Sequence, residues 1–504
     1  MLSLIKPSIA QYLGTLCWIA VSTFFACPFV MADGNKPTSA ESLAEKITLT
    51  EGRSAVNFFN PKSVSADDKE KLRLSSKATA YPAAPVDRLR PLLELGASFL
   101  GNGPIRPGIK APTGEMLQPW FLLYGSLRSA FQNFDNGNRN STEWVNRLDL
   151  NGNLNFSGTE RLLFSMRPLD SQSGRYTGYS SLYNRNNGWQ EDFNANLTKL
   201  YFEGDIGEIF PALDPTDSHT YDIGFSVGRQ RLQLQDGILA NDIVDMVGIT
   251  RNSLVFDGIS NLRMTGLYGW NNINRGNNAL TNNNHEHSAD LFGLEAEADT
   301  ALNNTVSVDL LYVNDNRDKN AWYMGAASTQ RFGWLNSTFR INASLPESKG
   351  SPTVGSGVLL LSQLSSTLPS SDNLVYFNTF WDIGRFTSAT RSPDQGGPLA
   401  NLGILYGPVG MGRYGVPLGK PIDNTVGTAI GYQMFLGGID RQLIFEIGGR
   451  TSTQSDKDDS AIAFGARYQQ TFGDHHVLRL DSFVADQEGM GISYGVRTEW
   501  MVKF

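Results

Sequence analysis

Arginine side chains are the groups in this chain whose type and position indicate specific chemistry. A guanidinium group is planar and always charged, and it binds a carboxylate through two parallel hydrogen bonds. Arginines that line a common aqueous space are therefore expected to bind acidic solutes. The arginines that we predict to bind substrate are Arg147, Arg161, Arg167, Arg229, Arg231, Arg263, Arg467 and Arg479, and Arg340 and Arg497 are further candidates for the same space.

Acidic residues accompany these arginines and support a second interpretation. Opposite charges on neighbouring strands form ion pairs that simply stabilise a sheet. The acidic residues expected on the same inner rows are Asp149, Glu203, Glu295, Glu297, Asp309, Glu446, Asp481 and Glu499. For each arginine, anion binding and a salt-bridge ladder are both open from the sequence.

Two other patterns resemble sites but lack essential parts. Asp149, Asn151, Asn153 and Glu160 occupy ligand positions of a calcium-binding loop, but Leu154 stands where that loop needs glycine. His285-Glu286-His287-Ser288 ends an Asn-rich segment and offers a histidine beside a serine, or two histidines for a metal, without an evident orienting partner. We therefore predict no catalytic site, no metal and no cofactor.

The segments that carry these residues have a period of two, which is typical of strands. The last strand is the clearest case: Ile492, Tyr494, Val496, Trp500, Val502 and Phe504 form an apolar row, and Ser493, Arg497, Glu499 and Lys503 form a polar row. Successive side chains of a strand point to opposite faces, so this strand has one face suited to hydrocarbon and one suited to water.

The charged rows indicate a wet interior, because a small soluble barrel fills its interior with apolar side chains. We therefore predict an all-β fold over residues 116–504, a transmembrane antiparallel β-barrel in the outer membrane of a Gram-negative bacterium. The count is about eighteen strands. The weakest predicted strands are 321–330 and 252–256, so sixteen is the alternative count.

The connections give an independent indication of topology. Counted backward from Phe504, with both termini in the periplasm, the periplasmic turns are short, and they fall at 473–474, 436–440, 368–373, 301–304, 257–260 and 157–159. The alternate connections are mostly longer and more polar, and they include 171–194, 271–287, 345–355 and 385–424. Short turns on one side and long loops on the other are typical of outer-membrane barrels. The connection 206–220 is longer than a periplasmic turn should be.

Residues 1–32 are predicted to be a cleaved signal peptide. Lys6 is their only charge, an apolar core spans 13–25, and Val30-Met31-Ala32 is a small-residue cleavage pattern. The rival interpretation is an uncleaved anchor, which Pro28 and the cleavage pattern disfavour. Residues 33–115 are predicted to be a separate N-terminal segment, either a periplasmic arm or a plug, with a short amphipathic helix at 86–100.

Composition limits the partners and the chemistry further. Both cysteines, Cys17 and Cys27, lie in the leader, so the mature chain is expected to have no disulfide and no thiolate metal site. Removal of Lys6 leaves 41 of the 42 basic residues against 50 acidic ones, a net charge of −9. A net charge of this sign argues against a nucleic-acid partner.

One stretch of the barrel segment resembles a known family. Val227-Gly228-Arg229-Gln230-Arg231-Leu232, followed by Gln235-Asp236-Gly237 and Asn241-Asp242, is similar to the alginate-export family of outer-membrane barrels. Leu200-Tyr201-Phe202-Glu203 and Arg147-Leu148-Asp149-Leu150 resemble that family's early strands. The resemblance covers 119–504, apart from the segment 385–424, and implies an arginine-rich lumen that passes an acidic polysaccharide.

The expected function is therefore an outer-membrane channel for a hydrophilic solute, namely an anionic polysaccharide or oligosaccharide, and the expected substrate partner is an anionic or neutral saccharide. A general or substrate-specific diffusion porin is the first alternative, and a barrel enzyme or a surface adhesin is the second. The other expected partners are outer-membrane lipid and the barrel-assembly machinery, which would read the terminal aromatic residue Phe504.

Two local expectations concern the lumen. The segment 396–407 is too apolar to stay in water, so part of it is expected to fold into the barrel mouth as a constriction. By parity, Arg229 continues the lipid-facing row of Phe225 and Val227, which is unfavourable for a charge. We therefore expect a bulge near Gly228 that turns Arg229 inward, toward Arg147, Arg161 and Arg467, and leaves Arg231 at the rim.

Overall fold

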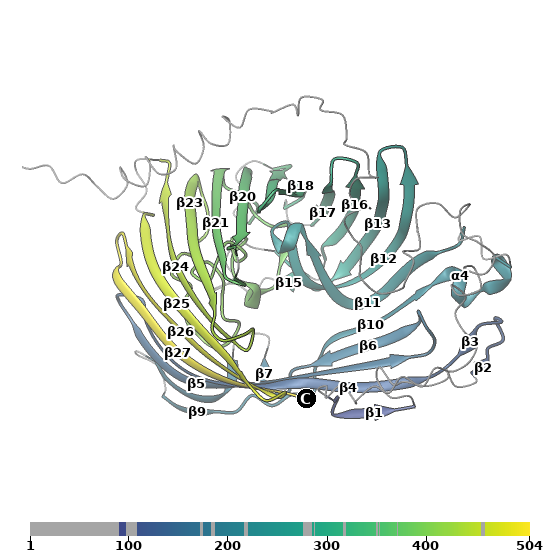
Figure 1. Ribbon diagram of the computed structural model, residues 1–504, viewed down its shortest axis with the longest axis horizontal. Helices are drawn as coiled ribbons and strands as arrows, with labels where there is room; N and C mark the ends of the chain where they lie inside the picture. The colour runs from purple at the N-terminus through teal and green to yellow at the C-terminus, as the bar shows by residue number, and fades with distance from the viewer. Residues whose placement is uncertain are drawn as a thin grey trace, which may run out of the picture. The chain divides into compact units, whose positions relative to one another are not determined.

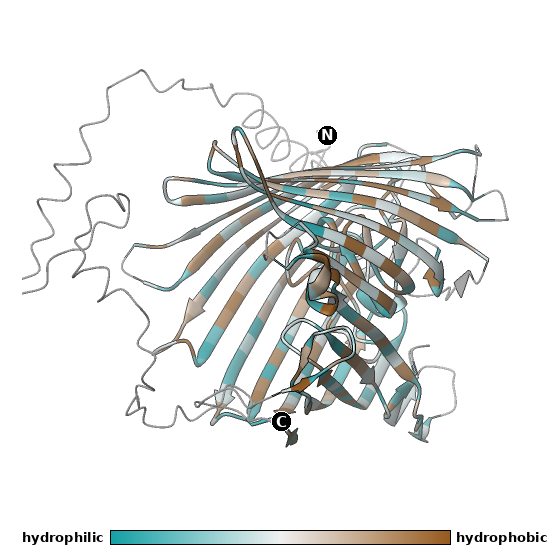
Figure 2. Ribbon diagram, turned by 90° about the vertical axis from the view of Figure 1, so that its right-hand side faces the viewer, coloured by the Kyte–Doolittle hydropathy of each residue, from teal (hydrophilic) through white to brown (hydrophobic). Residues whose placement is uncertain are grey.

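Long strands with alternating side chains make up most of the structure. The computed structural model describes residues 90–96, 108–171, 175–182, 187–215, 220–275, 285–286, 288–315, 319–348, 351, 353–369, 371–454 and 459–504. Hydrophobic and hydrophilic residues alternate along the strands, as the two-residue period predicts (Figure 2). The predicted leader lies outside the described residues.

The wall of the barrel consists of eighteen strands. They are β4 (Trp120–Asp135), β5 (Asn140–Asn155), β6 (Arg161–Met166), β10 (Leu197–Asp205), β11 (Ile223–Leu234), β12 (Ala240–Phe256), β13 (Ile259–Asn271), β16 (Asp290–Thr300), β17 (Asn304–Asn314), β18 (Ala321–Phe332), β19 (Leu335–Pro346), β20 (Gly357–Thr367), β21 (Leu374–Gly384), β23 (Thr425–Phe435), β24 (Arg441–Ser452), β25 (Ala461–Phe472), β26 (His476–Gln487) and β27 (Gly491–Lys503). Both weakly predicted segments are strands, in β18 and at the end of β12, so eighteen is the correct count.

The sheet closes on itself where the last strand meets the first. β27 pairs antiparallel with β4, from Tyr494 opposite Asp135 to Lys503 opposite Ser126. Figure 1 shows the yellow C-terminal strands β24–β27 curving around to the blue strands β4 and β5. Closure leaves no open edge along this seam, as a β-structure in lipid requires.

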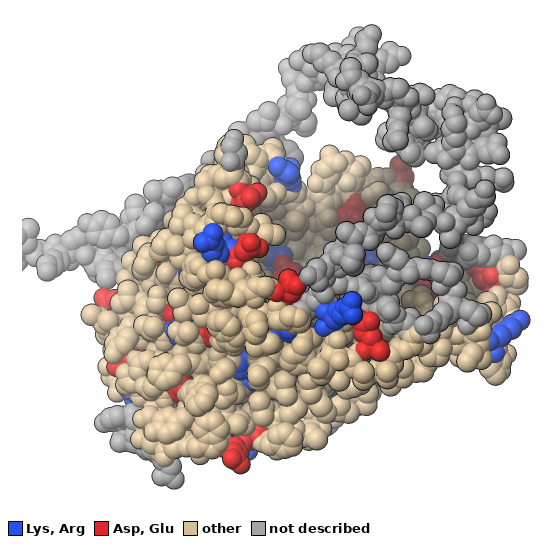
Figure 3. Space-filling model, turned by 60° about the horizontal axis from the view of Figure 1, so that its bottom comes forward, with Lys and Arg blue, Asp and Glu red and all other residues tan. Residues whose placement is uncertain are grey.

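The outer face of the wall is apolar. In β27, Ile492, Tyr494 and Val496 are exposed, whereas Arg497 and Glu499 are buried on the inner side. Broad stretches of the face shown in Figure 3 carry no charged side chain. An apolar outer band on a closed antiparallel barrel is the outer-membrane arrangement, and the protein is an outer-membrane barrel.

Helices contribute little to the described chain. None of the described helices combines the length and the apolar character that a membrane span needs. The helical turns are α4 (Ile206–Ile209), η2 (Pro211–Leu213), η3 (Gln235–Gly237) and η4 (Pro393–Gln395).

The turns follow the predicted two-sided pattern. The predicted short turns join β5 to β6, β12 to β13, β16 to β17, β20 to β21, β23 to β24 and β25 to β26. Gly258 and Gly473 lie in such turns with φ of +76° and +59°, which glycine adopts without strain. The longer connection between β10 and β11 contains α4 and η2. We call this side the short-turn end and the opposite side the long-loop end.

The third wall strand is interrupted. β6 pairs with Leu150–Asn155 of β5, toward the short-turn end. β8 (Arg175–Leu182) continues along the rest of β5, from Thr177 opposite Asn146 to Leu182 opposite Ser141. Between them the chain makes an excursion that contains β7 (Asp170–Ser171) and carries Arg167 and Asp170. β9 (Gly188–Gln190) then pairs with β8 on the way back to the wall.

The N-terminal segment has only short elements in its described part. β1 (Leu93–Leu95) pairs with Phe121–Leu123 of β4, next to the part of that edge which β27 occupies. The helix predicted at 86–100 is therefore wrong at these residues, because hydrogen bonding to the β4 edge overrides the local helical pattern.

The remaining small strands are β2 (Ile109–Lys110), β3 (Met116–Leu117), β14 (Ile273–Asn274), β15 (His285–Glu286) and β22 (Thr390–Arg391).

Deletion of Phe504 should lower the amount of folded barrel in the outer membrane. The Phe504 carbonyl accepts a 2.7 Å hydrogen bond from the Gly125 N–H, and its own N–H donates to the Gly125 carbonyl at 3.1 Å, so the deletion removes the last two bonds of the seam. This loss would be measured as a decrease in the amount of folded protein in outer-membrane fractions, which a gel shows as the band whose mobility changes on heating. Phe504→Trp keeps the backbone bonds and an aromatic ring and should restore the level, whereas unchanged insertion of the truncated chain would refute the role of this residue.

Candidate functional site

The segment 385–424, between β21 and β23, folds into the barrel, and we call it the inner loop. Asn378 on β21 donates a 2.6 Å hydrogen bond to the Leu402 carbonyl, and Arg128 on β4 donates one of 3.1 Å to the Val409 carbonyl. These partners belong to well-separated parts of the ring, so the loop crosses the lumen. Leu399, Leu402, Leu405 and Tyr406 are buried in it. The expected inward folding of 396–407 is confirmed.

One buried carboxylate anchors this loop to the wall. Glu446 on β24 is 1% exposed and accepts the backbone N–H groups of Ile404 at 2.8 Å and Leu405 at 2.9 Å. It also accepts the hydroxyl of Tyr376. A side chain at Gly403 would collide with the Glu446 carboxylate, so glycine is needed for the loop to approach it.

A second inward element comes from the tip of the β11–β12 hairpin. Gln235 donates a 2.6 Å hydrogen bond to Asp309 on β17, and Asp236 forms an ion pair with Arg340 on β19. The tip thus reaches the inner wall several strands away. Arg340 points inward, as predicted, but its charge is used to hold this tip.

The two inward elements bind each other. β22 of the inner loop pairs in parallel with the start of β12, Ala240 opposite Thr390. Arg391 donates to the carbonyls of Gly237 and Ile238. Asn401 donates to the Asp236 carbonyl. The lumen therefore contains one connected structure built from two loops.

Cations line one side of the lumen, and we call them the basic row. Its members lie on adjacent strands from β25 through the seam to β10, except Arg167, which directly follows β6, and they are Arg467, Arg479, Arg497, Arg128, Arg147, Arg167 and Lys199. Arg147, Arg167, Arg467 and Arg479 were predicted to bind substrate. Arg128 and Lys199 were missed, and in β4 the reason is that the inner row also holds Leu122 and Ala130, which hides the alternation.

Near the seam, the basic row is tied into a salt-bridge ladder. Arg497 lies 2.9 Å from Asp481 and also pairs with Glu499. Arg128 binds Glu499 and Arg467 binds Asp481, each at 2.5 Å. Arg497 is fully buried, so for this arginine the salt-bridge ladder is the correct interpretation and anion binding is not. Arg479 has a looser contact, 3.8 Å to Asp481.

Farther along the row, the charges bind the inner loop. Asp149 contacts Arg147 at 2.9 Å and Arg167 at 3.2 Å. Arg167 in turn binds Asp394 of the inner loop at 3.0 Å, and Arg147 donates a 3.0 Å hydrogen bond to the Gly410 carbonyl. The loop therefore lies against the basic row and covers part of it.

Two carboxylates beside Arg167 have opposite pKa shifts. Burial would raise the pKa of Asp394, but Arg167 and the hydrogen bonds from Ser392 and Gln395 outweigh it and lower the pKa to about 2. Burial raises the pKa of Asp170 to about 6, although Arg167 and Arg147 oppose the shift. Asp170 lies 3.8 Å from Arg147, so its charge is compensated only loosely.

The opposite wall is acidic. Arg263, a predicted substrate residue, lies 3.0 Å from Glu295 and 3.5 Å from Glu297. Asp299 and Asp309 follow on the same inner face of β16 and β17. Arg161, also predicted, pairs with Glu203 near the short-turn end and is about half exposed. Neither Arg161 nor Arg263 joins the basic row.

The predicted bulge at Gly228 is absent, and Arg229 does not turn inward. β11 pairs with β12 without a register shift from Ile223 to Leu234, and its pairing with β10 is also regular. Arg229 therefore stays on the face of Phe225 and Val227. On that face the charge of Arg229 is compensated by Asp245, to which Arg229 donates two hydrogen bonds of 2.7 and 2.9 Å. Arg231 donates to Asn241 and to Gln395 of the inner loop.

The histidine motif cannot be placed as a site. Only the backbone of His285 and Glu286 is described, in β15, and His287 lies outside the described residues. In the calcium-like pattern, Asp149 is bound to arginines and Asn151 accepts a hydrogen bond from Ser165.

Comparisons with known proteins identify the fold but no sequence family. No protein-family profile matches the chain, and no curated protein sequence matches it significantly. Similar solved structures are OpdO of Pseudomonas aeruginosa and OccAB3 of Acinetobacter baumannii, each with a TM-score of 0.50 and 11% identity. Both matches cover 76% of this chain, with 97% of OpdO and 99% of OccAB3. The outer membrane protein OpdK of Pseudomonas aeruginosa is a further match, with a TM-score of 0.49, 10% identity, and coverage of 76% of this chain and 98% of OpdK.

The comparisons bear out a porin-like outer-membrane barrel and do not support the alginate-export resemblance. In the short stretch Gly228-Arg229-Gln230-Arg231-Leu232, which carried that resemblance, the two arginines bind within the β11–β12 hairpin, through Asp245 and Asn241.

Glu446→Ala should release the inner loop and raise single-channel conductance, by about twofold if the loop leaves the lumen. The substitution removes the acceptor of two backbone N–H groups, and each buried donor left unpaired costs about 1–3 kcal/mol. Planar-bilayer recording would show higher and noisier current. Glu297→Ala, an inner carboxylate of the opposite wall, is the matched control and should leave conductance nearly unchanged. Identical traces for both variants would contradict the anchoring role.

Acidification should make the region around Arg147 and Arg167 more positive in a single step near pH 6. Because the folded pKa of Asp170 lies above its ordinary value, protonation favours the folded site, so the charge is lost without loosening the loop. Asp394 keeps its charge over the same interval. Anion preference, measured as reversal potential between pH 7.5 and 5, should rise more in the unmodified protein than in Asp170→Asn, in which other carboxylates of the inner wall can still take up protons. A rise of equal size in Asp170→Asn would assign the change to another group.

Proposed function

We propose that the protein is a selective diffusion channel for small anionic solutes, most simply carboxylates of monomeric or short saccharide size. The observation that carries the proposal is the asymmetry of the lumen. Among the described residues, the basic row contains seven cations, and six of them share the five carboxylates Asp149, Asp170, Asp394, Asp481 and Glu499, which leaves an excess of two positive charges. The facing wall has an excess of negative charge.

The pairing within the basic row suits transport better than tight binding. A conducting site must attract the solute enough for it to enter and weakly enough for it to leave. Asp481 and Glu499 bind Arg497 and Glu499 binds Arg128, so a passing carboxylate competes with these fixed partners. Arg467 and Arg479 are partly exposed, at 16% and 23% of their side chains, so they can exchange their partners for a passing carboxylate.

The inward elements argue for small solutes. The inner loop and the β11–β12 tip are held to the wall and to each other by buried groups, including Glu446 and Arg391. A lumen crossed by fixed backbone disfavours passage of a long acidic polymer. This supports a substrate-selective porin over polysaccharide export.

Removal of charge from the basic row should reduce anion selectivity. In Arg467→Gln combined with Arg479→Gln, the chloride-to-potassium permeability ratio should fall by about twofold to fourfold, because two partly exposed cations are lost. Reversal potentials in a salt gradient measure the ratio, and block by a monomeric uronate should weaken in parallel.

Arg229→Gln is the matched control, because this arginine lies on the outer side of the wall and pairs with Asp245. It should alter neither quantity. Equal effects of the control and of the double substitution would refute the proposal, and so would an unchanged permeability ratio in the double variant.

A further inference from the structure

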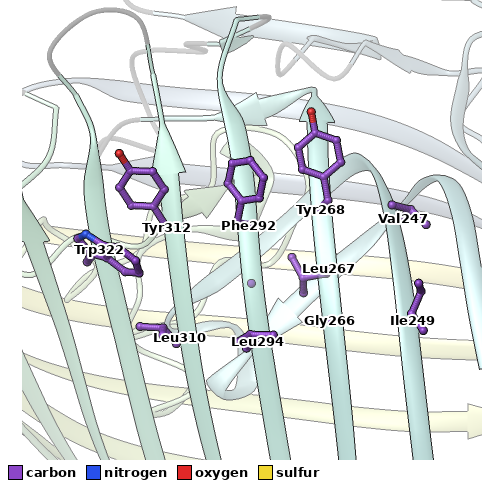
Figure 4. A pocket seen from close by; sticks show the side chains of 11 residues that line it. Val247, Ile249, Gly266, Leu267, Tyr268, Phe292, Leu294, Leu310, Tyr312 and Trp322 are labelled. Carbon is purple, nitrogen blue, oxygen red and sulfur yellow. The ribbon is translucent and has the colours of Figure 1, made fainter.

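A buried carboxylate lies outside the lumen, at the short-turn end of the barrel. Most of the outer wall is apolar and suits lipid, as Phe292, Leu294 and Trp322 of β16–β18 illustrate (Figure 4). Glu115 differs from these residues, because its side chain is only 9% exposed and its Oε1 atom accepts no hydrogen bond. A buried carboxylate oxygen without a partner is unfavourable, so a ligand of opposite charge would stabilise it.

The hairpin of β2 and β3 holds Glu115 against the barrel. Its turn is closed by a 2.8 Å hydrogen bond from the Ala111 N–H to the Glu115 carbonyl. Just after β3, the Gln118 N–H donates a 2.7 Å hydrogen bond to the Phe156 carbonyl. The hairpin is thereby fixed beside the turn that joins β5 to β6.

A second buried carboxylate, Glu160, lies at the end of that turn and is 3% exposed. Its Oε1 atom accepts the Thr159 hydroxyl at 2.6 Å and the Asp205 N–H at 3.3 Å. Its Oε2 atom accepts the Ser157 hydroxyl. Glu160 therefore joins the β5–β6 turn to the end of β10, and its position is fixed by both segments.

The two carboxylates lie beside each other and repel. Burial and the adjacent carboxylate of Glu160 raise the pKa of Glu115 to about 7, although the Ser157 hydroxyl opposes the shift. Glu208 of α4 adds a weaker repulsion. The charged groups that act on Glu115 are thus negative, and a cation between Glu115 and Glu160 would replace repulsion by attraction.

We propose that a calcium ion binds between Glu115 and Glu160 and fastens the β2–β3 hairpin to the short-turn end of the barrel. Calcium takes about six to eight oxygen ligands in a flexible geometry, and carboxylates, neutral oxygens and water all serve. The two carboxylates and the Ser157 hydroxyl are the protein ligands, and water completes the set. These donors are all oxygen atoms, which favours calcium over zinc.

The calcium-like pattern in the sequence does not reveal this site. That pattern combines Glu160 with Asp149, whereas the structure brings Glu160 to Glu115, which belongs to a separate segment of the chain. With only two carboxylates, the site is expected to be weak, with a Kd on the order of 0.1–1 mM, as in extracellular calcium-binding modules.

Glu115→Gln is the informative variant, because it removes one charge and keeps the size of the side chain. Glu115 belongs to none of the wall strands, so the barrel of this variant should still close. Asp257→Asn is the matched control. It removes the charge of an exposed carboxylate in the β12–β13 turn, which lies at the same end of the barrel.

Calcium binding is measured by equilibrium dialysis of radioactive calcium against the full-length protein, purified in detergent and first stripped with EDTA. The unmodified protein and Asp257→Asn should each bind one more ion per chain than Glu115→Gln. At a calcium concentration ten times the Kd, amide hydrogen exchange of residues 108–118 should slow by about tenfold in the first two proteins and stay unchanged in Glu115→Gln.

Equal calcium binding by all three proteins would overturn the proposal. Slower exchange of 108–118 at low pH without an effect of calcium would show that the two carboxylates share a proton, and this result would refute a bound cation. Magnesium dehydrates reluctantly and demands octahedral geometry, so it should protect the hairpin less, and equal protection by magnesium would refute the choice of calcium.

Discussion

The constraint on which this structure depends is that the wall must satisfy its own backbone hydrogen bonds in lipid. An unpaired N–H or C=O group in hydrocarbon costs several kcal/mol, so the strands must form a closed ladder. The register of β27 against β4 meets this requirement. Once the ring is closed, parity decides which side chains face lipid and which face the lumen, and charged residues are confined to the inside or to the rims.

Charged side chains that are confined to the lumen need partners, and ion pairs with neighbouring strands supply them. Buried ions are unfavourable unless they have partners, and a single unpaired arginine would be costly. Arg497 and Glu499 neutralise each other where no water reaches them. Arg467 and Arg479 keep partial access. The same ion pairs that make the inner wall stable therefore decide which charges remain accessible to a solute.

Much of the wall could be predicted from sequence, because two simple rules apply to it. Alternation identified the faces of β27, and the short turns fixed the topology and the strand count. Arg128 was missed because β4 mixes apolar and polar residues on its inner row. The inner loop could be expected to fold inward from its apolar character, but its attachment could not, since Glu446 binds backbone N–H groups that have no sequence signature. Arg229 was misplaced because its partner, Asp245, lies on the next strand and satisfies the charge without a change of register.

The pairing of β1 with β4 has a consequence for the order of events in folding. The seam joins segments at opposite ends of the barrel sequence, so its hydrogen bonds form only after all the intervening strands exist, and such non-local pairing is slow. β1 contacts β4 across a short stretch of chain, from Leu93 to Leu123, and this local pairing does not have to wait for the last strand. Part of the first strand's edge is thereby occupied from within the same molecule during the interval when an open edge invites aggregation. The short N-terminal strand thus pairs with Phe121–Leu123 of the β4 edge independently of β27.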